Sequence, residues 1–125
     1  MDVVNPATGE RVATYEAATE ADADAALARA TEAFDSWRDR PMRERERLLA
    51  DAAEVLRTNE AEYAALMTEE MGKPVEQARS EVQKCAWVCD YYAETASQHL
   101  APDAHASPPG TEVRTVHDPL GPVLA

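Results

Sequence analysis

An apolar repeat in the second half of the chain constrains the fold more than any other feature of the sequence. Apolar residues recur in steps of three and four between Pro74 and Leu100, which is the spacing of one face of an α-helix. The positions are Val75, Ala78, Val82, Cys85, Cys89, Tyr92, Ala96 and Leu100. Because a helix with one apolar face needs neighbours that cover it, the repeat predicts packed helices of which residues 74–100 form the longest.

Two shorter helices are predicted near the start of the chain. Thr19, followed by acidic Glu20 and Asp22, is a typical N-cap, and Pro41 suits the first turn of the next helix. The apolar stripes are Ala26, Ala30, Ala33, Phe34 and Trp37 in the first helix and Leu48, Leu49, Ala52, Val55 and Leu56 in the second.

A third helix is expected between these and the long one. Asn59 followed by Glu62 loosely matches a capping box. Tyr63, Leu66 and Met67 supply its apolar positions, and Gly72 is placed to be its C′ residue.

Extended segments flank the helices. Val3–Val4 and residues 12–15 surround a Pro/Gly turn, which predicts a hairpin. Residues 101–110 are expected to be an exposed connector, residues 111–117 a strand, and residues 119–125 the start of a buried strand. These strands lack enough partners within the chain, and an unpaired apolar strand leaves a sticky edge. We therefore expect the sequence to be cut short, with most of the parent protein's function beyond Ala125.

Charge and composition restrict the possible partners and compartments. The chain has 24 Asp and Glu against 12 Lys and Arg, a formal net charge of −12. This charge argues against nucleic acid or an anionic membrane as a partner. No stretch has the length of a membrane span, and no signal peptide is recognisable. A disulfide between Cys85 and Cys89 would have poor geometry across one helical turn, so we expect free thiols in a reducing cytoplasm.

The residue types that carry chemistry are sparse. Cys85 and Cys89 could form half of a metal site, but no constellation of His or carboxylate residues stands beside them and both continue the apolar stripe, so buried structural thiols are favoured. The three histidines, His99, His105 and His117, have no partner at ligand spacing. Residues 72–74 lack the glycines and the Ser or Thr of a phosphate loop. The sequence therefore predicts no catalytic, cofactor-binding or metal-binding residue, and substrate-binding residues stay unassigned.

Several segments in order resemble the NAD(P)-dependent aldehyde dehydrogenase family. They are Asn5-Pro6-Ala7-Thr8-Gly9-Glu10, the helix ending near Phe34 and Trp37, Arg47-Leu48-Leu49, Glu69-Glu70-Met71-Gly72-Lys73-Pro74, Glu81-Val82 with Tyr91-Tyr92-Ala93-Glu94, and Asp118-Pro119-Leu120-Gly121-Pro122-Val123-Leu124-Ala125. The resemblance covers essentially the whole chain. Residues 71–74, 84–86 and 89–94 look most like succinate-semialdehyde dehydrogenases.

The resemblance implies an α/β fold of which this chain is the N-terminal portion. Residues 1–110 would be the hairpin and helical part of the dinucleotide-binding domain, residues 111–118 a strand of the oligomerisation arm, and residues 119–125 the start of the next dinucleotide-domain strand. The intact parent would be a cytoplasmic homo-oligomer. Its long helix would border the aldehyde entrance, so Trp87, Val88 and Tyr91 are the residues that could touch substrate.

The family's chemistry is implied in the same way. A cysteine thiolate attacks the aldehyde, a hydride passes to NAD or NADP, and a glutamate-activated water releases the acid. The nucleophile, the general base, the oxyanion-hole Asn and the dinucleotide loop would all lie beyond Ala125. This chain alone is therefore expected to bind no cofactor and to be inactive.

A different class of function stays open from the sequence. The chain could be a complete, non-catalytic acidic helical module that binds a partner through its strand edge. A zinc site at Cys85 and Cys89 is a third and more distant alternative.

Overall fold

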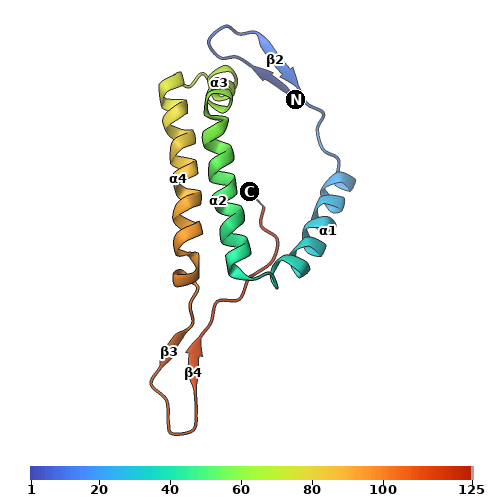
Figure 1. Ribbon diagram of the computed structural model, residues 1–125. Helices are drawn as coiled ribbons and strands as arrows, with labels where there is room; N and C mark the ends of the chain where they lie inside the picture. Colours follow the sequence, from blue (N-terminus) through green and yellow to red (C-terminus); the bar gives the residue numbers. More distant parts are fainter. Residues whose placement is uncertain (125) are drawn as a thin grey trace.

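The computed structural model describes residues 1–124, which form four helices and four short strands (Figure 1). In chain order they are β1 Asp2–Val4, β2 Arg11–Thr14, α1 Glu20–Trp37, α2 Met42–Thr58, α3 Glu60–Met71, α4 Val75–His99, β3 Asp103–His105 and β4 Val113–Thr115. The four predicted helices are confirmed, and α4 is the longest of them.

The helices α2, α3 and α4 form one packed layer, with the two long helices side by side in Figure 1. The buried side chains of the described chain are small: Ala53 from α2, Ala64 from α3, and Ala78, Val82 and Ala86 from α4. Alanine at a contact lets two helix backbones approach closely, and interhelical distance depends on the side chains at the contact. The layer is therefore held by close backbone approach, without a large, fully buried side chain among residues 1–124.

The buried face of α4 is narrower than the apolar stripe predicted from the sequence. Ala78, Val82 and Ala86 recur every four residues and face α2 and α3, whereas Cys85 is exposed and Cys89 is half-buried. The expectation that both cysteines are buried structural thiols is therefore wrong for Cys85. The physical reason is that α2 and α3 cover only part of the stripe within the described chain.

Helix α1 begins at the N-cap predicted from the sequence. The Asp22 backbone N–H donates to the Thr19 hydroxyl at 3.2 Å, and the Thr19 N–H donates to the Asp22 carboxylate at 2.9 Å, which completes a capping box. None of the described residues of α1 is buried, and the helix stands apart from the layer in Figure 1. Its apolar stripe is therefore largely without a partner in residues 1–124.

The N-terminal hairpin is confirmed, and its turn contacts the end of α3. Strands β1 and β2 pair antiparallel, and the Asn5 side chain accepts a hydrogen bond from the Ala7 N–H at 2.9 Å. Gly72 ends α3 with φ of +70°, as predicted, and a Cβ at this position would lie 2.7 Å from Pro6 Cγ. The left-handed backbone and the close approach both require glycine.

The predicted capping box of α3 is wrong. Asn59 occupies the position before α3, but its side chain donates to the Val55 carbonyl at 2.8 Å, at the end of α2. The Asn59 side chain thus satisfies a carbonyl at the C-terminus of α2 and not an N–H group of α3. Asn59 is the only residue between the two helices.

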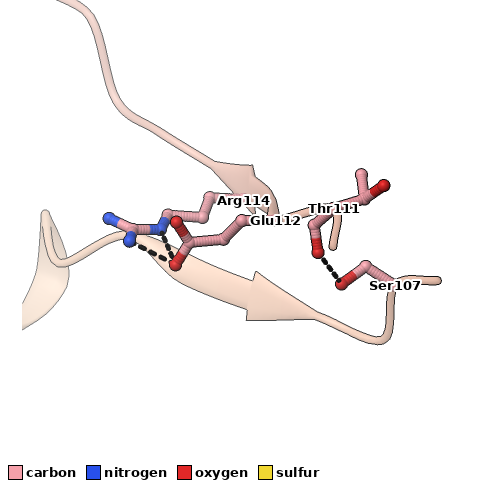
Figure 2. Close-up of polar contacts among 4 residues, drawn as sticks. All are labelled: Ser107, Thr111, Glu112 and Arg114. Atoms are coloured by element: carbon pink, nitrogen blue, oxygen red, sulfur yellow. Dashed lines mark hydrogen bonds and ion pairs between the residues drawn. The ribbon is translucent and has the colours of Figure 1, made fainter. Parts of the chain in front are cut away.

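A second hairpin, β3–β4, extends beyond the helical layer (Figure 1). The predicted strand 111–117 shortens to Val113–Thr115, and its partner β3 lies in the segment that the sequence suggested was a connector. The turn is fastened by the Ser107 hydroxyl, which donates to the Thr111 carbonyl at 2.7 Å, and an ion pair joins Arg114 to Glu112 (Figure 2). All six residues of the two strands are exposed.

The predicted strand after residue 118 is not formed in the described residues 119–124. Leu120 and Leu124 are fully exposed, and Ala125 lies outside the described residues. An apolar segment becomes a strand only when a neighbour accepts its backbone hydrogen bonds. Instead, residues 122–124 lie against α1 and line with it a cavity of about 410 Å³.

We predict that Gly72→Ala lowers the free energy of unfolding by about 2 kcal/mol, from the left-handed backbone and the displaced Pro6 ring. Urea unfolding followed by circular dichroism measures it. Gly110→Ala is the matched control, because φ there is +81° but no atom lies within 4 Å of an added Cβ. Equal losses for the two variants would show that the Pro6 contact is unimportant.

The capping box also predicts that the stability of α1 depends on pH in the acid range. The hydrogen bond from the Thr19 backbone lowers the pKa of Asp22 below its usual 3.8. A carboxyl whose pKa is lower in the folded state stabilises the fold above its unfolded pKa and loses this effect as the pH falls through its folded pKa. We therefore expect α1 to lose helicity below about pH 4 in the wild type, and Asp22→Asn to remove part of that transition.

Circular dichroism between pH 5 and pH 2 measures this acid transition. Asp24→Asn is the control, since Asp24 lies in the same turn without a hydrogen bond to Thr19 in the described chain. An unchanged acid profile for Asp22→Asn would contradict the prediction.

Candidate functional site

A hollow on the described chain runs along the exposed face of α4. It has a volume of about 680 Å³ and is lined by Ser80, Glu81, Lys84, Cys85, Val88 and Cys89. These positions lie on one side of the helix because they are spaced by one, three and four residues. Two thiols and a valine make the floor apolar, while Glu81 and Lys84 supply charge at one end.

Charged contacts hold α4 in this orientation. Lys73, in the turn before α4, forms an ion pair with Glu81, and Arg57 of α2 forms one with Asp90. The hydrogen bond to Asp90 raises the pKa of Arg57, so the guanidinium stays cationic beside the hollow. Of the two pairs, only Arg57–Asp90 joins α4 to α2.

An aromatic row continues along α4 beyond the hollow. The ring centroids of Trp87 and Tyr91 are 5.9 Å apart, and those of Tyr91 and Tyr92 are 5.2 Å apart in an edge-to-face arrangement. The Tyr91 hydroxyl lies 3.0 Å from Nε2 of His99. Trp87, Tyr91 and Tyr92 are exposed, so this row offers flat apolar surface with one polar end.

The three residues that the family resemblance suggested could touch substrate lie in two places. Val88 lines the hollow, whereas Trp87 and Tyr91 belong to the aromatic row. The structure does not bring the three together into one cavity within the described residues.

A second cavity, of about 360 Å³, was not predicted from the sequence. It lies where the α1–α2 turn meets the segment after β4, and its lining residues are Arg38, Asp39, Met42, Arg45, Leu100, His117, Asp118 and Pro119. The Nε atom of Arg45 is buried there without a hydrogen-bond partner in the described chain. Residues this far apart in sequence carry no shared local pattern, which is why sequence reasoning missed the cavity.

The metal-ligating residue types do not converge in residues 1–124. The described chain holds no group of three or more His, Cys, Asp or Glu side chains placed to bind one ion. His99 contacts Tyr91, and His105 lies 2.8 Å from the Thr115 hydroxyl, while His117 lines the second cavity. Both cysteines are free, as predicted.

None of the described helices is long and apolar enough to cross a membrane. Within residues 1–124 the hollow has no histidine in its lining that could act as a base for a thiol. The hollow can border a binding space.

Comparison with known proteins gives consistent matches over the length of the chain. The family described as "Aldehyde dehydrogenase family" matches residues 1–125. A succinate-semialdehyde dehydrogenase for NADP(+) from Mycobacterium tuberculosis is 41% identical over 124 residues, covering 98% of this chain and 27% of the relative. One from Deinococcus radiodurans is 38% identical over 121 residues, covering 97% and 25%.

Solved structures agree with the sequence matches. The crystal structure of succinic semialdehyde dehydrogenase from Streptococcus pyogenes, in complex with NADP+, superimposes with a TM-score of 0.85 at 29% identity. It covers 92% of this chain and 25% of that structure. The chain therefore spans about a quarter of the length of the relatives it matches.

We predict that the Arg57–Asp90 pair contributes little to the free energy of unfolding. The two side chains are 51% and 32% exposed, and exposed ion pairs contribute about 0.2–1 kcal/mol. A double-mutant cycle with Arg57→Gln and Asp90→Asn, read by urea unfolding, should give a coupling free energy in that range. A coupling above about 2 kcal/mol would show that the pair is a main support of the layer.

Proposed function

The chain belongs to the aldehyde dehydrogenase family, and on that premise we propose that it forms part of an enzyme that oxidises an aldehyde to the carboxylic acid with NAD or NADP. The family match over residues 1–125 carries the proposal. The substrate we propose is succinate semialdehyde, because relatives at 41% and 38% identity bear that name. Their names also favour NADP over NAD.

The proposal assigns the chemical step to residues outside this segment. A reactive cysteine is activated by a helix N-terminus or by a neighbouring cation or base. Cys85 and Cys89 lie in the middle of α4, far from its N-terminus. Lys84 lines the same hollow, but no histidine base does so among the described residues. We therefore assign them no catalytic role.

The described residues do not fit a dinucleotide. A dinucleotide loop needs several glycines close together at the start of a helix, so that the backbone can approach the pyrophosphate. The four glycines, Gly9, Gly72, Gly110 and Gly121, are dispersed, each with positive φ in a separate turn or loop.

In the intact enzyme, this segment would supply structural surfaces and no catalytic groups. The hollow on α4 would border the aldehyde entrance, with Val88 as the predicted wall residue that lines it. The exposed β3–β4 hairpin would serve subunit association in a homo-oligomer.

The free thiols of Cys85 and Cys89 favour a reducing compartment, and we place the enzyme in the cytoplasm.

A chimera tests the proposal. Residues 1–124 would replace the matching segment of the Mycobacterium tuberculosis relative. We expect the purified chimera to reduce NADP when it is given succinate semialdehyde, and the 125-residue chain alone to give no turnover. Measurable NADP reduction by the chain alone, or a folded chimera without activity, would overturn the proposal.

The cysteines allow a matched control in the same chimera. Cys85→Ser combined with Cys89→Ser is expected to leave kcat within about twofold, because the thiols take no part in the chemistry. Loss of activity with unchanged circular dichroism would show that one of these thiols acts in the reaction.

A further inference from the structure

One charged group in the lining of the hollow on α4 has no partner in the described chain. The two charged residues of that lining are Glu81 and Lys84. The Glu81 carboxylate is paired with Lys73, whereas no ion pair within residues 1–124 involves Lys84. The described residues therefore leave one uncompensated positive charge at the hollow, on a chain whose formal net charge is −12.

Lys84 lies on the same side of α4 as Val88, the predicted wall residue. Ser80, Lys84 and Val88 form a row with a spacing of four residues, and neighbours in such a row have Cβ atoms about 6 Å apart. The Ser80 hydroxyl donates to the Glu76 carbonyl at 2.9 Å, so it is already engaged within the helix. Lys84 is exposed, and its flexible four-carbon stem carries the ammonium group at the edge of the apolar floor.

We propose that Lys84 binds the carboxylate of the substrate at the aldehyde entrance, and so selects aldehydes whose other end is anionic; this rests on the proposed function. The carboxyl of succinate semialdehyde is ionised at neutral pH, and a methylene chain separates it from the aldehyde. The hollow matches both parts, because Lys84 offers a charge-assisted hydrogen bond to the carboxylate and Val88 offers van der Waals contact to the methylenes. Lys84 is thus a specificity residue and takes no part in the chemical step.

The acidic charge of the chain opposes the approach of an anionic substrate. A net charge of −12 repels a carboxylate over the Debye length, which is about 8 Å at physiological salt. A cation in the lining reverses this effect locally, because the nearest charge dominates at short range. Lysine suits a ligand in passage, since its ammonium is a single point charge and does not hold a carboxylate in a two-point geometry as arginine does.

Steady-state kinetics of the chimera with the Mycobacterium tuberculosis relative test the proposal. Succinate semialdehyde is compared with butanal, which has the same chain length and no carboxylate. We expect Lys84→Gln to raise KM for succinate semialdehyde about fivefold, the upper end of the effect of an exposed ion pair, with kcat unchanged. KM for butanal should change less than about twofold, and Lys84→Arg, which keeps the charge, should retain most of the affinity for succinate semialdehyde.

Arg79→Gln is the matched control, because it removes the same charge from another side of α4. Arg79 is exposed, lies five positions before Lys84 and about 140° around the helix, and is not among the residues that line the hollow. It should leave both KM values unchanged. The effect of Lys84→Gln should also shrink as NaCl is raised to about 0.5 M, since salt screens exposed charges. Both side chains are exposed, so their replacement opens no core cavity, and circular dichroism checks that the helices remain.

Calorimetric titration with succinate measures the carboxylate contact without turnover. Lys84→Gln should raise the Kd for succinate about fivefold, and Arg79→Gln should leave it unchanged.

The outcomes separate the two proposals. Weaker succinate binding in Lys84→Gln alone, in a folded chimera without turnover, supports the role of Lys84 and overturns the proposed function. Oxidation of succinate semialdehyde with the same KM in Lys84→Gln supports the proposed function and overturns the role of Lys84. Equal rises in KM for the two aldehydes, equal effects of Lys84→Gln and Arg79→Gln, or the absence of succinate binding also overturn that role.

Discussion

The close approach of α2, α3 and α4 through small side chains is the constraint on which the rest of the structure depends. Ala53, Ala64, Ala78 and Ala86 are fully buried where the helices meet, together with Val82. Alanine contributes little apolar area, so this contact supplies geometry more than free energy. The larger apolar side chains remain on the outer surfaces of the layer, where Val55 and Leu66 are each about half exposed.

The buried face of Ala78, Val82 and Ala86 sets the rotation of α4 about its axis, and polar contacts accompany it. The Glu81 carboxylate is paired with Lys73 at one end of the helix, and Asp90 is paired with Arg57 further along. Gln83 also donates to Glu60 of α3 at 2.9 Å. Exposed contacts of this kind add little stability. Val88 lies on the side of α4 that lines the hollow.

Features governed by neighbours in sequence could be predicted from the sequence. The Thr19–Asp22 capping box and the left-handed Gly72 each depend on a few consecutive residues, and both are present. The helices followed from periodicity, and the family from ordered motifs. The N-terminal hairpin followed from its Pro/Gly turn.

Features that depend on distant partners could not be predicted in the same way. Strand β3 exists because β4 pairs with it, and its own residues, Asp103–His105, have no strand pattern. The exposure of Cys85 depends on how much of α4 its neighbours cover, which periodicity does not report. The cavity around Arg45 and His117 joins segments about seventy residues apart and has no signature in either.

The contiguity of the helical layer has a consequence for synthesis of the polypeptide. Its three helices occupy residues 42–99 without interruption by any segment from elsewhere. Contacts between neighbours in sequence have a low entropic cost of loop closure and form quickly. Since domains form during synthesis from the N-terminus onward, the layer can assemble on the ribosome while later residues are still being added. Its alanine contacts then act as a template, present early, on which later segments can condense.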